Sequence, residues 1–101
     1  MTGAAGAITV RERDGERHVV LEGEVDLDVV SRLSDEDRLG FVHAVDSAAL
    51  TFLDSSGLRF LLGLTAVNPE VRLVDPPPVL VELLEMTGTA PLFRTEPAQR
   101  S

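Results

Sequence analysis

The sequence predicts a single-domain α/β fold, in which a mixed β-sheet opens with an antiparallel hairpin and has helices packed against it. Two observations predict it. Beyond the first hairpin, short β-prone runs alternate with apolar segments at helical spacing. Near the N-terminus, two β-prone runs are separated by Asp14-Gly15, a strong hairpin signal. A chain of 101 residues can bury one hydrophobic core but not two. The expected order is β-β-α-β-α-β-α, with room for one last strand.

The first half of the chain supplies the hairpin and a short helix. Strands are expected at 7–13 and 18–22. Val29, Val30 and Leu33 lie at i, i+1 and i+4, a spacing that predicts a short helix. Asp26 or Asp28 can cap this helix. Residues 1–6 are expected to form a flexible N-terminus.

The second half supplies the remaining elements. A buried strand is expected at 41–45, with Asp46 ending it, and a second β-prone run at 50–53. A helix is expected from about Ser56 to Val67, with its main face at Leu58, Leu61, Leu62 and Thr65. A strand at 71–74 follows, and then a helix capped by Asp75 and ended by Gly88. A short edge strand is expected at 92–94. The domain is expected to span 7–94, followed by a loose tail at 95–101.

The charge balance excludes several classes of partner. Nine basic and 17 acidic residues give a net charge of −8. Nucleic acids and anionic membrane surfaces both attract basic patches, so neither is expected as a partner. The N-terminus lacks the basic start and apolar run of a signal peptide, which predicts a cytoplasmic protein. A protein partner with basic residues at its docking surface fits better.

No cofactor, metal site or catalytic activity is expected. The chain has no cysteine, and the acidic stretch 35–37 lacks the ligand spacing of a calcium loop. His18 and His43 are far apart in sequence and have no third ligand in an obvious motif. Ser55 lacks the Gly-x-Ser-x-Gly context of a hydrolase. A receiver module phosphorylated on aspartate would need a lysine near its carboxylates, and the chain has no lysine.

The candidate functional stretch is Asp54-Ser55-Ser56-Gly57, which lies between a β-prone run and a helix. Asp and Ser are preferred N-caps, and Gly57 lets the backbone turn without a Cβ penalty. Two hydroxyls therefore lie at a helix start, where the dipole tolerates an anion such as a phosphate. Alternatively, the tetrapeptide serves only to cap the helix that follows it. Likewise, Asp26 can be only the cap of the first helix.

Four landmarks in this order make the chain resemble the STAS family, specifically the bacterial anti-sigma factor antagonists. They are Leu21-Glu22-Gly23-Glu24-Val25-Asp26, Val45-Asp46, the run from Leu50 to Leu58 through Asp54-Ser55-Ser56-Gly57, and the run from Val81 to Gly88. The resemblance implies a regulatory protein without catalysis. Its unphosphorylated form would bind an anti-sigma factor that has serine kinase activity, and so free a sigma factor. Phosphorylation of Ser55 would release that partner, and a serine phosphatase would reset the protein.

The resemblance also implies a partner-binding face. It would comprise Asp26, Asp54, Ser55, Ser56, Gly57 and Leu58. Ser56 is expected to cap the helix that follows. Two alternatives stay open: a STAS adaptor or scaffold of a stressosome-like or lipid-transport complex, and a plain homodimeric domain.

The chain departs from the family pattern in one place. The segment between Asp26 and Phe41 is shorter, and the first helix is expected to lose a turn or more. Asp46 and the later landmarks keep their mutual spacing, so the fold prediction is unaffected. The identity of the partner is what this departure makes uncertain.

Overall fold

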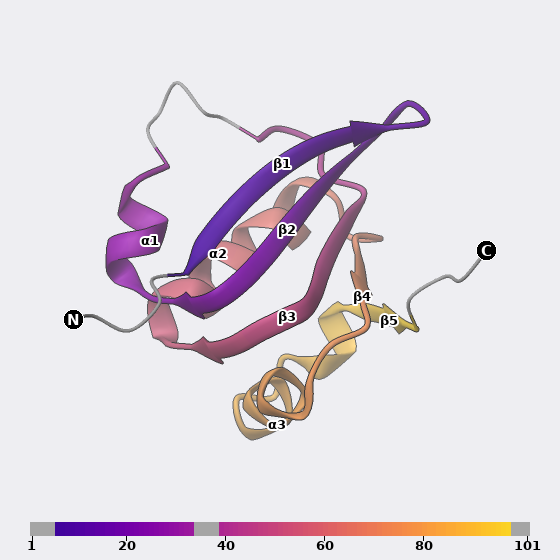
Figure 1. Cartoon of the computed structure of the whole chain (residues 1–101). Helices are drawn as coiled ribbons and strands as arrows, with labels where there is room; N and C mark the ends of the chain where they lie inside the picture. Colours follow the sequence, from indigo (N-terminus) through magenta and orange to yellow (C-terminus); the bar gives the residue numbers. More distant parts are fainter. Residues whose placement is uncertain (1–5, 34–38, 98–101) are drawn as a thin grey trace.

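Five strands form one mixed sheet in the computed structural model, which describes residues 6–33 and 39–97 (Figure 1). Their spatial order is the order of the sequence, β1-β2-β3-β4-β5. The first pair is antiparallel and each later pair is parallel. The strands are β1 (Ala7–Arg13), β2 (Glu16–Val25), β3 (Ala44–Leu53), β4 (Arg72–Val74) and β5 (Arg94–Glu96). The α/β fold with an opening antiparallel hairpin is thus confirmed.

The hairpin turns at the dipeptide that the sequence singled out. Asp14 and Gly15 both have positive φ, 52° and 80°, as a two-residue hairpin turn requires. Arg13 pairs with Glu16 across this turn, and the register continues from there to Ala7 and Glu22. β2 extends beyond the expected 18–22, which gives β3 a long edge for parallel pairing.

β3 corrects the prediction for the middle of the chain. Residues 44–53 form one strand and not two, so Asp46 lies inside a strand and does not end one. Irregularities in the β2–β3 register, between Val20 and Glu22 and between Gly23 and Glu24, let all of β3 stay paired with the shorter stretch of β2 from His18 to Val25. The buried Ser47 adds a cross-strand link, since its Oγ donates to the Val74 carbonyl at 3.2 Å. Such pairing is a tertiary effect that local sequence does not reveal.

Three helices accompany the sheet in the described part of the chain: α1 (Leu27–Ser31), α2 (Ser55–Val67) and α3 (Pro78–Met86). The five residues of α1 confirm the short first helix. α2 lies across one face of the sheet, behind β2 and β3 in Figure 1. Alternate strand residues such as Val19 and Leu21 meet its buried side chains in a single core.

The buried side of α2 differs from the predicted one. Leu58, Leu61 and Leu64 are buried, whereas Leu62 is only partly buried. These three leucines are spaced by three residues and form one stripe along the helix. Val67, at the end of α2, is 53% exposed.

α3 begins later than predicted. Asp75 does not cap it: this residue has a φ of 54°, and the N-cap position belongs to Pro77, which makes no side-chain cap bond. Proline disfavours the α-helical conformation in the residue before it, so Pro76 and Pro77 stay outside the helix and the chain enters it only at the last proline of the run, Pro78. Gly88, with a φ of 73°, ends the helix as expected.

The C-terminal boundary also moves. A short 3-10 turn, Ala90–Leu92, precedes β5, and β5 extends the sheet to Glu96, two residues past the boundary expected at 94. The predictions for residues 1–5, for the acidic stretch 35–37 and for residues 98–101 fall outside the described residues. In the described ranges, no helix has the length and apolar character needed to cross a bilayer.

Candidate functional site: two register-matched strand–helix junctions

Two equivalent junctions meet at one end of the sheet. β2 and β3 are parallel neighbours whose last residues, Val25 and Leu53, are paired in register. Each strand is followed by one aspartate and then by a helix: Asp26 leads into α1 and Asp54 into α2. The Asp54 N–H donates to the Val25 carbonyl at 3.3 Å, which ties one junction to the other. The sheet therefore places Asp26 and Asp54, 28 positions apart in sequence, at equivalent places on adjacent strands.

Asp54 is the N-cap of α2. Its Oδ1 accepts from the backbone N–H of Ser56 at 2.9 Å and from that of Gly57 at 3.0 Å. Its backbone carbonyl accepts from the Leu58 N–H at 3.0 Å. The Asp54 carboxylate thus satisfies two N–H groups of the first turn that lack intrahelical partners, and its carbonyl accepts the first intrahelical bond.

Asp26 is the N-cap of α1 and uses the same chemistry on a smaller scale. Its Oδ1 accepts from the Val29 N–H at 3.1 Å, and its carbonyl accepts from the Val30 N–H at 2.9 Å. The capping roles of both aspartates follow from this geometry.

The two serines lie inside α2 and not before it. Ser55 is the first residue of the helix and is exposed, whereas Ser56 is the second and is half-buried. The prediction that Ser56 caps the helix is therefore wrong. Asp54 precedes both serines, and its carboxylate reaches the N–H groups two and three residues ahead, so a serine cap is superfluous.

Gly57 lies where α2 crosses the end of β2 and β3. A Cβ on this residue would lie 2.8 Å from Leu53 Cγ and 3.0 Å from the Val25 carbonyl oxygen, and would also overlap Leu53 Cδ1. Gly57 and Leu58 are both buried. These two residues of the predicted partner face therefore hold the helix start against the strands, and their side chains do not form the surface.

Two exposed apolar side chains beside the junctions were missed by the sequence analysis. Leu27, the first residue of α1, is 62% exposed, and Phe52, next to last in β3, is 47% exposed. Each flanks one of the junctions. Sequence alone gave no signal for them, because both belong to apolar runs that are typical of core.

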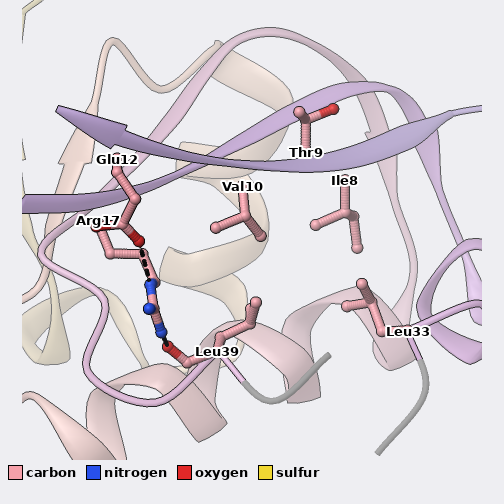
Figure 2. Close-up of a pocket in the computed structure, with 7 residues that line it drawn as sticks. All are labelled: Ile8, Thr9, Val10, Glu12, Arg17, Leu33 and Leu39. Atoms are coloured by element: carbon pink, nitrogen blue, oxygen red, sulfur yellow. Dashed lines mark hydrogen bonds and ion pairs between the residues drawn. The ribbon is translucent and has the colours of Figure 1, made fainter. Parts of the chain in front are cut away.

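A separate hollow lies on the core side of β1. It measures about 460 Å³ and is lined by Ile8 and Val10 on one side and by Leu33 and Leu39 on the other, whereas Thr9 points away from it (Figure 2). Arg17 Nε pairs with Glu12 Oε2 at 2.7 Å, and the same guanidinium donates to the Leu39 carbonyl. The charges at this end of the hollow are already paired with each other, and none of the predicted site residues lines it.

The two histidines lie near each other, since Ala44, the neighbour of His43, pairs with His18, but each forms its own hydrogen bond. His18 Nε2 bonds Glu16 Oε1 at 3.0 Å, and His43 Nδ1 accepts from the Arg17 N–H at 3.0 Å. Within residues 6–33 and 39–97, no group of three His, Asp or Glu side chains is arranged to hold a metal ion.

The solved structures that share this fold include the following two. The anti-sigma factor antagonist SpoIIAA in its unphosphorylated form is 20% identical, with a TM-score of 0.64 over 91% of this chain and 89% of that chain. An uncharacterised protein of the DUF3478 family with a SpoIIAA-like fold, from Shewanella loihica PV-4, is 10% identical, with a TM-score of 0.58 over 99% of this chain and 92% of that chain. No curated protein sequence matches significantly. The family model described as "Mlab, STAS domain" matches residues 8–93, so the chain belongs to the STAS domain family.

Proposed function

We propose that this STAS domain is a cytoplasmic, non-enzymatic anti-sigma factor antagonist that is switched by phosphorylation of Ser55. Its unphosphorylated form would bind an anti-sigma factor with serine kinase activity, and a serine phosphatase would reverse the modification. The observation that supports this most is the exposed hydroxyl of Ser55 at the start of α2, next to the capping carboxylate of Asp54 and beside the Asp26 junction.

The hydrogen bonds at this helix start determine what a phosphate would do. Asp54 already accepts from the N–H groups of Ser56, Gly57 and Leu58, so a phosphate on Ser55 gains little from them. The helix dipole contributes about 0.3–1 kcal/mol to an exposed anion. Against this stand the like charge of Asp54 and the cost of desolvating a group of charge about −1.5 to −2 under a docked protein, which is several kcal/mol. Phosphorylation should therefore weaken partner binding and leave the fold intact.

The surface around Ser55 indicates the chemistry of the partner. Leu27 and Phe52 offer apolar contact on either side of the junctions, and Asp26, Asp28 and Asp54 add acidic groups. An apolar patch surrounded by basic side chains would complement this surface. Gly57 and Leu58 would serve it indirectly, by fixing the position of α2.

Phosphoryl transfer from the candidate kinase tests the proposal. The purified chain is incubated with the anti-sigma factor encoded nearest to it and with ATP, and intact mass and fragmentation locate the phosphate. We expect one phosphate on Ser55 and loss of the complex in a pull-down with ATP. Ser55→Ala should abolish both effects and still bind. Ser56→Ala is the matched control, because it removes a neighbouring hydroxyl and keeps the capped N–H. Phosphate on Ser56, or loss of the complex on ATP addition with Ser55→Ala, would contradict the assignment.

A second candidate is a STAS adaptor or scaffold subunit without a phosphorylation switch. The matching family model is described as an Mlab STAS domain and not as an anti-sigma factor antagonist, and α1, which borders the proposed docking face, has only five residues. The identity of a co-purified partner separates the two candidates. An ATPase of a transport complex that binds equally well with and without a phosphate on Ser55 would favour the adaptor.

A further inference from the structure

In the part of the chain that the structure describes, no helix lies across the side of the β1–β2 hairpin that faces away from α2 (Figure 1). We call this side the outer face. Side chains alternate along a strand, so on the β1–β2 hairpin the residues that alternate with the core residues belong to it: Ala7, Thr9, Arg11, Arg13, Glu16, His18, Val20, Glu22 and Glu24. Figure 2 shows Thr9 pointing away from the side to which Ile8 and Val10 point. Parallel strands are normally covered on both faces, and here β2 to β5 are parallel.

The outer face is divided by charge. At one end the register aligns one row across all five strands, with Arg11, His18, Arg72 and Arg94 on four of them and Ala44 on β3. We call it the basic row. Arg13 follows on the same side of β1. At the other end of the hairpin, the exposed Glu22 and Glu24 occupy the same face of β2. His18 and Arg72 are paired with Glu16, and Arg72 also with Glu96. Among the described residues, Arg11, Arg13 and Arg94 form no ion pair, so this end keeps an excess of positive charge.

We propose that two copies of the chain associate through the outer faces of their β1–β2 hairpins. The charges select the symmetry. A two-fold axis that runs parallel to the strands would place basic ends together, whereas one perpendicular to the strands places each basic end over the acidic end of the other copy. This proposal is independent of the proposed function of Ser55.

The register fixes which residues would meet. Thr9 and Val20 are paired, with Arg11 and His18 two residues to one side and Ala7 and Glu22 two residues to the other. A two-fold axis through the Thr9–Val20 pair exchanges these two rows. Arg11 then lies over Ala7 of the second copy, one strand away from its Glu22. Arg13 stands in the same relation to Glu24. Stacked sheets are about 10 Å apart, a gap that long charged side chains can bridge.

Two residues oppose this arrangement. Glu16 pairs with Arg13 in register and would therefore lie over Glu24 of the second copy, although its carboxylate is already paired with His18 and Arg72. The second residue is Asp46, which pairs with Val20 in register and therefore lies in the central row of the outer face. Two copies related by this axis would bring their Asp46 carboxylates towards each other. The Asp46 Oδ1 also accepts from the Ala48 N–H at 3.1 Å, a bond that an asparagine oxygen can keep. Asp46→Asn should therefore strengthen the association without changing the local backbone.

Sedimentation velocity of the full chain at low ionic strength tests the proposal. We expect a species of twice the 10.9 kDa chain mass, which dissociates as salt screens the charges. Arg11→Glu acts twice in a two-fold interface and should raise the dissociation constant at least tenfold, and the charge-swapped Arg11→Glu/Glu22→Arg should recover most of the loss. The matched control is Arg59→Glu, which makes the same charge change at an exposed position of α2.

Each outcome decides the matter. A single 10.9 kDa species at all protein concentrations would overturn the proposal and leave the basic row to an acidic partner of another kind. Equal effects of Arg11→Glu and Arg59→Glu, or no recovery in the charge swap, would overturn the proposed pairing. Ser55→Ala should leave the association unchanged, so failure of this proposal and failure of the phosphorylation switch are distinguishable.

Discussion

The two strand–helix junctions use the same device with different results. Both follow strands that end in register, both begin with an aspartate N-cap, and both helices start on the next residue. The Asp26 junction starts a helix of five residues with Leu27 at its first position. The Asp54 junction starts a helix of 13 residues with Ser55 there. One junction therefore exposes an apolar side chain and the other a hydroxyl that can be modified.

The difference separates the structural role of the two aspartates from the regulatory role that we propose for Ser55. An N-cap is a structural necessity for both helices, because the first N–H groups of each would otherwise lack partners. The side chain of the residue after the cap is not needed to accept hydrogen bonds from these N–H groups, so it can face a partner. The functional assignment therefore depends on Ser55, while the aspartates hold it in place.

The largest effect on this comparison is expected from Gly57→Ala. The new Cβ would meet the side chain of Leu53 and the Val25 carbonyl, so α2 must shift away from both junctions. We expect a loss of about 1–3 kcal/mol in the free energy of unfolding, measured by urea denaturation. Gly63→Ala is the matched control: Gly63 lies in the same helix, and beyond the local helix backbone no atom lies within 4 Å of the new Cβ. Alanine should stabilise the fold there by about 0.5–1 kcal/mol. Equal effects at the two glycines would refute the close approach.

Removing each cap in turn compares the junctions directly. Asp54→Ala should cost about 1–2 kcal/mol, because two N–H groups of a long helix lose their acceptor. Asp26→Ala removes one such bond from a helix of five residues and should cost about 0.5–1 kcal/mol. Thermal or urea unfolding measures both. The conservative Asp54→Asn should recover most of the loss; a larger loss for Asp26→Ala would reverse the ranking of the junctions.

At the opposite end of β2 from the junctions, Glu16 should make the stability of the fold depend on pH. The hydrogen bond from His18, and then that from Arg72, holds the pKa of Glu16 below its ordinary value of 4.5. A carboxyl whose pKa is lower in the folded chain stabilises the fold above its unfolded pKa. That contribution is lost as the pH falls through the lower, folded value.

The urea midpoint should therefore drop on the acid side of about pH 4.5, and Glu16→Gln should reduce this drop. Glu82→Gln, at an exposed position of α3, is the control. If Glu16→Gln left the acid-side fall of the urea midpoint unchanged, the carboxylates that stabilise the fold would lie elsewhere.

The smallest effect is expected from Ser55→Ala. The hydroxyl is exposed and forms no hydrogen bond to a described residue, so the free energy of unfolding should change by no more than about 0.5 kcal/mol. The same variant should lose phosphoryl acceptance altogether. A large loss of stability would mean that Ser55 supports the junction as the aspartates do, and that its side chain is not structurally dispensable.

Local sequence determined much of this protein. The Asp14-Gly15 turn, the short first helix, the glycine that ends α3 and the strand–helix order all follow from short-range rules, because turn and cap residues act on their nearest neighbours. The resemblance to the STAS family, which rested on the order of a few motifs, was also confirmed, by the family match over residues 8–93.

Tertiary structure decided the rest. β3 is continuous through Asp46 because β2 and β4 flank it on both sides, and Asp54 takes the cap from Ser56 because the end of β3 positions its carboxylate. Pairing in register also brought Asp26 beside Asp54 and aligned the basic row of the outer face across five strands. These features depend on which strands become neighbours. Sequence periodicity tells which side of a strand is buried, but only the folded sheet tells what lies beside it.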